Sequence, residues 1–310
     1  MENLKFEGVP QRLDVFVTER ETGFSREFAK KMINEGRVLV NGRARKPSFL
    51  LSPDDLVTIT LPETGKSKAG KKDKEDLEAI LIYEDKDMLA ISKPAGLAVH
   101  PNDSNWMRRP QACLMAEATV VSMLLKARPA LLKSGVERLG LVHRLDRDTS
   151  GIMLAAKTKE AQTALQRQFR EREVAKTYLG VVSGVPAKKT GSIDAPIGRA
   201  SGFKKIKVWE YGRDALTEFK VIEKTKRHAL LEIYPRTGRT NQIRIHLEFI
   251  KHPVVGDKLY GGEPAARLLL HAYELIFTHP SKDKKTSLSV TPPEEFTREW
   301  ARLKQQGTET

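Results

Sequence analysis

Only one cysteine, Cys113, occurs in the 310 residues, and this scarcity excludes two kinds of stabilisation. A single thiol can form neither an intramolecular disulfide nor a thiolate metal cluster. Long apolar runs are also missing, because no stretch approaches the roughly 20 apolar residues that a membrane-spanning helix needs. The first residues, MENLKFEGVPQRLD, carry acids and lack the apolar core of a secretory signal. We therefore expect a soluble, cytoplasmic protein.

Acidic residues are too few to balance the basic ones. The chain has 54 Lys and Arg against 40 Asp and Glu, a formal net charge of +14. Such an excess favours a polyanionic partner, and nucleic acid fits better than a membrane surface in a chain without apolar runs. Residues 1–63 are neutral overall, whereas residues 77–310 carry 39 basic and 27 acidic side chains. The excess charge therefore lies in the larger part of the chain, where we expect the chemistry.

Residues 64–76, TGKSKAGKKDKED, contain five lysines and no large apolar side chain. Such a segment buries too little surface to offset the entropy of ordering it, so we predict a flexible charged linker between domains at 1–63 and 77–310. Gly65-Lys66-Ser67 resembles the end of a phosphate-binding loop. Thr60 stands where that motif requires a glycine, and the linker interpretation is the better one.

The segment before the linker predicts a short helix followed by a hairpin. Ser25 can cap a helix that ends near Gly36 and turns four apolar side chains inward: Phe28, Ala29, Met32 and Ile33. Val38-Leu39-Val40, then Asn41-Gly42, then a returning run indicate a strand and a tight hairpin turn.

Basic side chains gather on this predicted helix and hairpin. We expect an RNA-contacting surface formed by Arg26, Lys30, Lys31 and Arg43, and a merely solvated helix face is the alternative. Most of residues 10–61 resemble the small RNA-binding domain named after ribosomal protein S4. The segment GRVLVNG (36–42) carries the strongest part of that resemblance.

Residues 77–310 mix strand-like and helix-like patterns without a regular strand–helix–strand rhythm. The patterns predict a helix at 159–171, with Ala161, Leu165 and Phe169 on one face. They also predict strands in the segments 79–96, 152–158, 175–184, 214–223 and 228–235. We therefore predict an α+β fold with a mainly antiparallel sheet, preceded by a small α/β domain.

The segment LVHRLDRDTSGIML (141–154) places charges of both signs between two apolar runs. We expect a strand to end at His143 and the polar cluster to project on a turn closed by Gly151. Asp146 could simply cap that turn through backbone N–H groups. The string DTSG (148–151) also resembles the active-site loop of aspartic proteases. That chemistry pairs two such loops, and no second one exists in this chain.

A second charged cluster, in YPRTGRTNQIRIHLEFIKHPVVGD (234–257), places Arg236, Arg239, Arg244 and His246 around a predicted strand-to-helix transition. Arg244 has apolar neighbours, and an arginine in such a setting is usually paired with a carboxylate or packed by its stem. With Asp146 as partner, we expect the pKa of the aspartate to be lowered. An ionised carboxylate there suits nucleophilic or base chemistry at a sugar carbon. Because no metal-ligand spacing is evident, we expect this chemistry to need no metal.

Six segments, in order, resemble the RluA/RluD-type RNA pseudouridine synthases, and the resemblance covers almost all of residues 77–297. They are KPAGLAVHP, LVHRLDRDTSGIMLAAKT, AKTYLGVVSG, GRTNQIRIHL, HPVVGDKLYGG and LLLHAYELIFTHP. The resemblance implies an isomerase that converts uridine to pseudouridine without a cofactor. The implied substrate is structured RNA, with large-subunit ribosomal RNA of the 23S type favoured. We expect RNA as the partner, and neither a membrane, a metal nor a second subunit.

The same resemblance implies roles for individual residues. Asp146 is the catalytic residue, Tyr178 packs on the target base, and Arg244 pairs with Asp146. Arg144 fills the space that a flipped uridine vacates, because extruding a base costs a few kcal/mol of stacking. His143 also contacts the RNA, and phosphates are bound by Lys176 and Arg239. Without the resemblance, Tyr178 could equally be a core tyrosine of a strand.

Two features depart from the family pattern. Asn241 stands where the family generally has histidine, and residues 102–138 match poorly. The second stretch should hold a substrate-facing loop and helix, so the target uridine stays open. Two other functions also stay open: a non-catalytic RNA-binding or ribosome-assembly factor, and a uracil-base hydrolase that leaves an abasic site.

Overall fold

The computed structural model describes residues 2–20, 26–60, 77–101, 104–107, 113–114, 118–199 and 205–306. The chain divides into two compact units, Met1–Ala79 with Val99–Leu139 and Ile80–Ala98 with Gly140–Thr310. The predicted linker 64–76 and the predicted cap Ser25 lie outside the described residues. The domain boundaries derived from the sequence therefore stay predictions.

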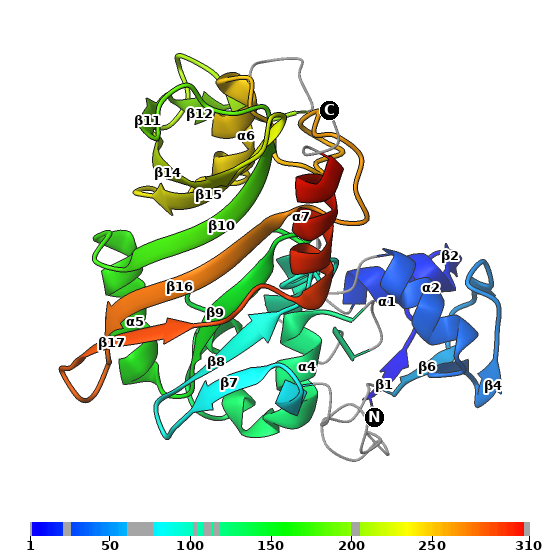
Figure 1. Cartoon of the computed structure of the whole chain (residues 1–310). Coiled ribbons are helices and arrows are strands. Elements are labelled where there is room, and N and C mark those ends of the chain that lie inside the picture. Colours follow the sequence, from blue (N-terminus) through cyan, green and yellow to red (C-terminus); the bar gives the residue numbers. More distant parts are fainter. Residues whose placement is uncertain are drawn as a thin grey trace. The chain divides into compact units, whose positions relative to one another are not determined.

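The first unit begins with two helices and two small antiparallel sheets (Figure 1). The strand order of the larger sheet is β1-β6-β3-β4, and β2 pairs with β5. The elements are β1 (Glu2–Lys5), β2 (Gln11–Arg12), α1 (Leu13–Arg20), α2 (Arg26–Asn34), β3 (Val38–Val40), β4 (Arg43–Ala44), β5 (Leu50–Leu51) and β6 (Leu56–Ile59).

Helix α2 and the hairpin that follows it form as the sequence predicts. Ala29, Met32 and Ile33 are buried on one face of α2, while Phe28 is partly buried against the same core. Between β3 and β4, Asn41 and Gly42 have φ values of 52° and 74°. Two consecutive residues with positive φ match the tight turn that Asn-Gly favours, because its twist suits the paired strands.

Residues 99–139 contain short helices: η1 (Ser104–Met107), α4 (Val120–Ala127), η3 (Pro129–Leu132) and η4 (Glu137–Gly140). Helix α4 begins with a capping box. The amide of Ser122 donates to the Thr119 hydroxyl at 3.1 Å, and the amide of Thr119 donates to the Ser122 hydroxyl at 2.9 Å. The poorly matched segment thus contains the expected helix, and its contact with substrate stays a prediction.

A nine-stranded sheet forms the centre of the second unit, in the order β11-β14-β15-β10-β16-β9-β8-β7 with β17 on β16. The pairing of β9 with β16 is parallel and the other pairings are antiparallel, which confirms the predicted mainly antiparallel α+β sheet. The elements of the second unit are β7 (Leu81–Glu84), β8 (Met88–Lys93), β9 (Ser150–Ala156), α5 (Lys159–Arg170), β10 (Ala175–Ser183), β11 (Thr190–Asp194), β12 (Ile197–Gly198), β13 (Lys207–Val208), β14 (Leu216–Lys224), β15 (His228–Pro235), α6 (Gln242–Phe249), β16 (Leu270–Thr278), β17 (Lys285–Ser289) and α7 (Glu294–Gln306). Strands β12 and β13 pair with each other in a separate two-stranded sheet.

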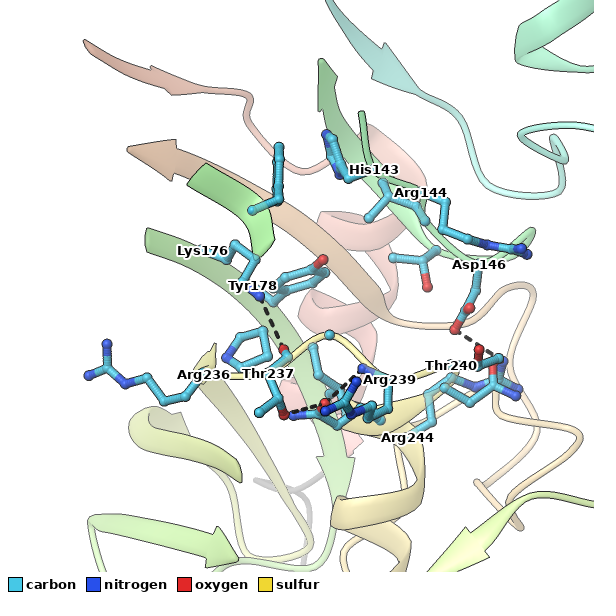
Figure 2. A pocket seen from close by; sticks show the side chains of 18 of the residues that line it. His143, Arg144, Asp146, Lys176, Tyr178, Arg236, Thr237, Arg239, Thr240 and Arg244 are labelled. Carbon is cyan, nitrogen blue, oxygen red and sulfur yellow. Dashed lines mark hydrogen bonds and ion pairs between the residues drawn. The ribbon is translucent and has the colours of Figure 1, made fainter. Parts of the chain in front are cut away.

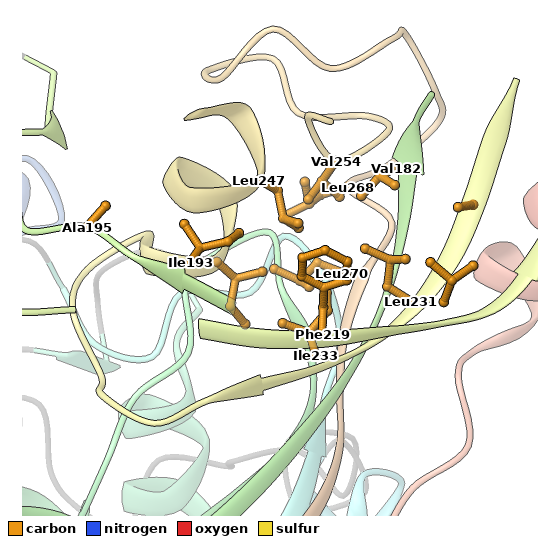
Figure 3. Close-up of a cluster of buried hydrophobic side chains, with 13 residues drawn as sticks. Val182, Ile193, Ala195, Phe219, Leu231, Ile233, Leu247, Val254, Leu268 and Leu270 are labelled. Carbon is orange, nitrogen blue, oxygen red and sulfur yellow. The ribbon is translucent and has the colours of Figure 1, made fainter. Parts of the chain in front are cut away.

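Adjacent residues of β10 face two different cores, because side chains alternate across a strand. Val181 packs in a cluster with Phe296 and Trp300 of α7. Val182 packs in another with Leu247 of α6 (Figure 3). Helices thus cover both faces of the sheet at β10. No helix in the described part of the chain is long and apolar enough to cross a membrane.

The expectation that a strand ends at His143 is wrong. Leu141 forms only an isolated bridge to Ala155, and regular strand begins at Ser150. The imidazole Nε2 of His143 accepts the backbone N–H of Leu154 at 2.9 Å, so this ring takes a donor that a neighbouring strand would otherwise use. Gly151 lies inside β9 and does not close the turn.

The Gly151→Ala variant should unfold at a markedly lower urea concentration than the parent. Gly151 has a φ of +121°, and an added Cβ would come within 2.2 Å of the Ala272 carbonyl oxygen in the parallel β9–β16 pair. We expect a loss of about 3 kcal/mol or more in the free energy of unfolding. Gly261→Ala is the control, because its φ is +77° but nothing lies near its added Cβ. The control should lose about 1–2 kcal/mol, and equal losses in the two variants would contradict the prediction.

Candidate active site

A cavity of about 470 Å³ opens in the second unit between four segments of chain. These are the loop before β9, the end of α5, strand β10 and the β15–α6 loop (Figure 2). Among the described residues, one carboxylate, Asp146, lines this cavity. Seven cationic side chains line it: Arg144, Arg170, Arg172, Lys176, Arg236, Arg239 and Arg244. A cavity of this volume is typical of sites that bind small molecules, and its excess of positive charge suits an anionic ligand.

Arg244, on the first turn of α6, lies between two carboxylates. Its Nε and Nη2 donate to the two oxygens of Asp257 at 2.7 and 2.8 Å, and its Nη1 lies 3.7 Å from Asp146 Oδ2. The side chains of Arg244 and Asp257 are 9% and 0% exposed, against 23% for Asp146. The predicted pairing of Arg244 with Asp146 is therefore present, but Asp257 makes the closer, bidentate contact.

Tyr260 and Asn241 complete the surroundings of Arg244. The guanidinium carbon lies 5.1 Å from the centre of the Tyr260 ring, within the range of a cation–π contact. Asn241 accepts from Arg244 Nη1 at 3.1 Å and donates to the Tyr260 hydroxyl at 3.2 Å. Asn241 has a φ of 55°, a left-handed conformation that asparagine adopts more readily than most residues. The residue that departs from the family pattern thus takes part in orienting Arg244.

The expected lowering of the pKa of Asp146 is wrong in sign. Burial raises the pKa of this carboxyl above its ordinary value, although Arg244, Arg144 and Lys93 act in the opposite direction. The cause is that desolvation penalises the charged form. The guanidinium of Arg244 would favour the charged form of Asp146 most, but it interacts more closely with Asp257.

The turn around Asp146 is held by its backbone. The amide of Thr149 donates to the carbonyl oxygen of Asp146 at 3.2 Å, while the carboxylate faces Arg244. Lys93, which is fully buried, supports this turn. Its Nζ donates to the carbonyl oxygens of Pro94, Leu97 and Arg147 at 2.8–2.9 Å. Burial lowers the pKa of Lys93 to about 7.

Tyr178 enters the cavity from a bulge in β10. The register with β16 shifts between Thr177 and Tyr178, and such bulges redirect side chains. Figure 2 shows its ring directed into the cavity between the Asp146 loop and the β15–α6 loop. Burial, with a further contribution from Asp146, raises the pKa of the Tyr178 phenol. The hydroxyl therefore stays protonated at neutral pH and can donate a hydrogen bond.

The β15–α6 loop is held by a network of buried polar side chains. Gln242 Oε1 accepts from the Thr237 hydroxyl at 2.6 Å and from the Arg239 amide at 2.9 Å. Lys176 Nζ donates to the Thr237 carbonyl at 3.1 Å, and burial lowers its pKa to about 8. Lys176 therefore combines a structural contact with a position on the cavity wall.

Arg144 and His143 occupy the upper side of the cavity in Figure 2. Arg144 is exposed at the entrance. His143 stacks on Phe169, with ring centres 4.5 Å apart, and burial lowers its pKa to about 3. The neutral ring, whose Nε2 accepts a hydrogen bond from the Leu154 amide, forms part of the cavity wall and adds no charge to the cavity. Arg239 lines the opposite side, where its Nε donates to the carbonyl oxygen of Asp214 at 3.0 Å.

Among the residues of this site to which the sequence reasoning gave no role are Asp257, Lys93, Arg170 and Arg172. Asp257 lies in HPVVGDKLYGG and Lys93 in KPAGLAVHP, two segments that carry the family resemblance. Neither role was visible, because pairing and burial depend on contacts distant in sequence. Arg170 is the last residue of α5 and Arg172 lies two residues beyond it, at a basic helix end that the sequence alone suggests is a solvated face.

The predicted RNA-contacting residues of the first unit are not all alike. Lys30, Lys31 and Arg43 are exposed. Arg26 Nε lies 3.3 Å from Asp14, whose side chain is fully buried, so this arginine also serves the packing of α1 against α2. These four residues belong to a different compact unit from the cavity.

Among the described residues, one group has the ligand types of a metal site: Asp85, Asp87 and His279. Asp85 already accepts several hydrogen bonds. Its Oδ2 accepts from His279 at 2.8 Å, from Tyr83 at 2.7 Å and from Lys282 at 3.0 Å. The group therefore acts as a network that joins the β16–β17 turn to the β7–β8 turn.

The fold and the site define a class: an enzyme with a carboxylate and a guanidinium in a basic cavity that suits a polyanionic substrate. Residues 87–249 match the family described as RNA pseudouridylate synthase, and residues 11–57 match the S4 domain. The chain belongs to the RNA pseudouridylate synthase family, whose members are isomerases that act on RNA, and it carries an S4 domain at its N-terminal side. The resemblance deduced from the sequence is confirmed.

Similar proteins cover nearly the whole chain. A protein of Aquifex aeolicus (strain VF5), named an uncharacterized RNA pseudouridine synthase, is 38% identical over 94% of this chain and 93% of its own length. The ribosomal large subunit pseudouridine synthase D of Xanthomonas campestris pv. campestris is 35% identical over 95% of this chain and 89% of its own. The solved structure of human RNA pseudouridylate synthase domain containing 4 is 26% identical, with a TM-score of 0.59, and covers 74% of this chain and 95% of that one.

The Asp257→Ala variant should lose both stability and activity. It leaves the buried Arg244 guanidinium without its bidentate partner, and breaking a buried pair from one side costs about 3–5 kcal/mol. Urea unfolding measures this loss. Glu218→Ala is the matched control, because its pair with Arg236 is exposed and should be worth about 1 kcal/mol or less. A similar small loss in both variants would show that Arg244 does not depend on Asp257.

Proposed function

We propose that this protein isomerises uridine to pseudouridine in large-subunit ribosomal RNA, with Asp146 as the catalytic residue. One observation carries the proposal. The carboxylate of Asp146 lies 3.7 Å from Arg244 inside a cavity whose other charged side chains, among the described residues, are cations. Relatives named ribosomal large subunit pseudouridine synthase D, at 33–35% identity over more than nine tenths of this chain, support the choice of RNA.

The reaction breaks the bond between ribose and the uracil nitrogen and rejoins the base through carbon 5. The hydrogen of carbon 5 is lost to solvent and the freed nitrogen gains one, so atoms balance without a co-reactant. The target base must leave its stack to reach Asp146, at a cost of a few kcal/mol. In our proposal Arg144, exposed at the entrance, occupies the vacated space.

In the proposal, Tyr178 contacts the target base, and Lys176 and Arg239 contact phosphates. The Tyr178 ring packs on the base, and its protonated hydroxyl can donate a hydrogen bond because the pKa of the phenol is raised. Lys176 and Arg239 bind phosphates, and His143 contributes an uncharged wall. Exposed Lys30, Lys31 and Arg43 of the first unit, together with Arg26, increase the local concentration of RNA.

Asp146→Asn should abolish tritium release from RNA labelled at uracil carbon 5. The amide cannot act as a nucleophile or base, while its size is nearly that of the carboxylate. The substrate is an in-vitro transcript of large-subunit ribosomal RNA, which carries no modification. Asp148→Asn is the matched control, since this exposed aspartate lies two residues further on and should retain release. Release by Asp146→Asn at the parental rate would defeat the catalytic assignment.

The same assay separates the alternative functions. A wild-type chain that binds the transcript in a salt-dependent manner but releases no tritium would be a binding factor. A uracil hydrolase would leave abasic sites, which aniline treatment would convert to strand breaks. Either result would replace the isomerase proposal.

Arg144→Gln should move the acid limb of the pH profile to higher pH. Burial raises the pKa of Asp146, and the charge of Arg144 opposes that rise, so removing this charge raises the pKa further. If ionised Asp146 is the active form, more alkaline conditions are then needed for the same kcat/KM. Tritium release measured across the pH range tests this, with Arg144→Lys as the charge-retaining control. An acid limb that is the same in Gln, Lys and parent would rule the effect out.

A further inference from the structure

The turn that follows β13 presents an aromatic side chain to solvent. Tyr211 is 80% exposed, more than any other large aromatic side chain described here. Single exposed apolar residues need no explanation by themselves. Four further observations, on its aromatic backing, its anchoring, the contacts of its two ends with the active site and its charged surroundings, give this one a function.

The first observation is that Tyr211 has an aromatic backing. Its ring centre lies 5.7 Å from that of Trp209, with an angle of 60° between the planes. Trp209 is itself half-buried, with its indole ring against Gly198, where an added Cβ would come within 3.2 Å of it. An edge-to-face pair of this kind restricts the Tyr211 ring and leaves one side open.

The second observation is that the turn is anchored to β12. The amide of Trp209 donates to the Pro196 carbonyl at 2.8 Å, and Ile197 and Arg213 exchange two backbone hydrogen bonds of 2.9 Å. Gly212 approaches Ile197 so closely that an added Cβ would lie 2.5 Å from its carbonyl carbon. A ring on so constrained a turn loses little entropy when a ligand stacks on it.

The third observation is that both ends of this segment contact the active site. Before the turn, the carbonyl oxygen of Ile206 accepts from the Tyr260 hydroxyl at 3.1 Å, and Tyr260 packs against Arg244. After it, the carbonyl oxygen of Asp214 accepts from Arg239, which lines the cavity.

Cations accompany the aromatic pair on this segment. Lys205 Nζ lies 4.3 Å from the centre of the Tyr260 ring, and Lys207 Nζ lies 5.9 Å from that of Trp209. Arg213 is exposed next to the turn. Aromatic rings interleaved with cations are the pattern by which proteins hold single-stranded nucleic acid, since every base has a face that can stack.

We propose that Tyr211 stacks on an unpaired RNA base close to the target uridine and so contributes to substrate selection. This inference rests on the proposed function for the identity of the substrate. The occupant is a nucleobase, because the neighbouring cations and the cationic cavity suit the phosphates on either side of it.

The experiment compares Tyr211→Ala with Tyr211→Phe and with Phe249→Ala. Phe249 is a matched control, since it is 49% exposed on α6 and takes no part in the site. The probe is a fluorescein-labelled dodecamer of single-stranded RNA, and the same dodecamer in a duplex. Binding to each is measured by fluorescence anisotropy with the full chain.

We expect Tyr211→Ala to weaken single-strand binding about tenfold and Tyr211→Phe to restore it, because the ring and not the hydroxyl stacks. Duplex binding should change little in either variant, since paired bases already stack on each other. With the tritiated transcript, KM for Tyr211→Ala should rise far more than kcat falls. Phe249→Ala should resemble the parent in all three measurements.

Unchanged single-strand binding by Tyr211→Ala would overturn the inference, and so would an equal loss in Tyr211→Phe or an equal loss on the duplex. The binding measurements need no turnover. A wild-type chain that releases no tritium would therefore defeat the proposed function, while the anisotropy results would still decide the stacking contact.

Discussion

The buried guanidinium of Arg244 is the constraint on which the site depends. A cation in a nearly dry environment must be compensated, and the fully buried carboxylate of Asp257 provides this by accepting two short hydrogen bonds from Arg244. One guanidinium nitrogen is left to contact Asn241 and Asp146. Because Asp257 satisfies most of Arg244, the contact with Asp146 is longer, and the Asp146 carboxylate remains partly exposed to the cavity. Asp257 thus compensates the charge of Arg244, while Asp146 stays accessible from the cavity.

Protonation in the site follows from the balance between burial and charge. Burial raises the pKa of Asp146 and Tyr178, and it lowers the pKa of Lys93 to about 7 and that of Lys176 to about 8. In each case the less charged form is favoured, as desolvation requires. For Asp146 the nearby cations limit the rise. The cationic cavity therefore serves two purposes: it attracts a polyanion, and it keeps the aspartate closer to its ionised form.

The sheet of the second unit places these groups because its two faces are independently buried. Val181 and Val182 point to opposite cores, so helices α7 and α6 can both pack at β10. Two local irregularities then direct the chemistry. The bulge at Tyr178 turns a strand residue into the cavity, and the left-handed conformation of Asn241 starts α6 beside the β15 end. Regular pairing supplies rigidity and the irregular positions supply the site.

The sequence by itself determined the elements and the kinds of residue in the site. Period-two and helical patterns located β9, α5, β10, β14 and β15, and the motif around Asp146 with that around Arg244 indicated an RNA pseudouridine synthase. Only the tertiary structure decided that Asp257 is the nearer partner of Arg244, that burial raises the pKa of Asp146, and that His143 is not in a strand. The physical reason is that pairing and desolvation depend on which distant segments pack together, and that property belongs to no local stretch of chain.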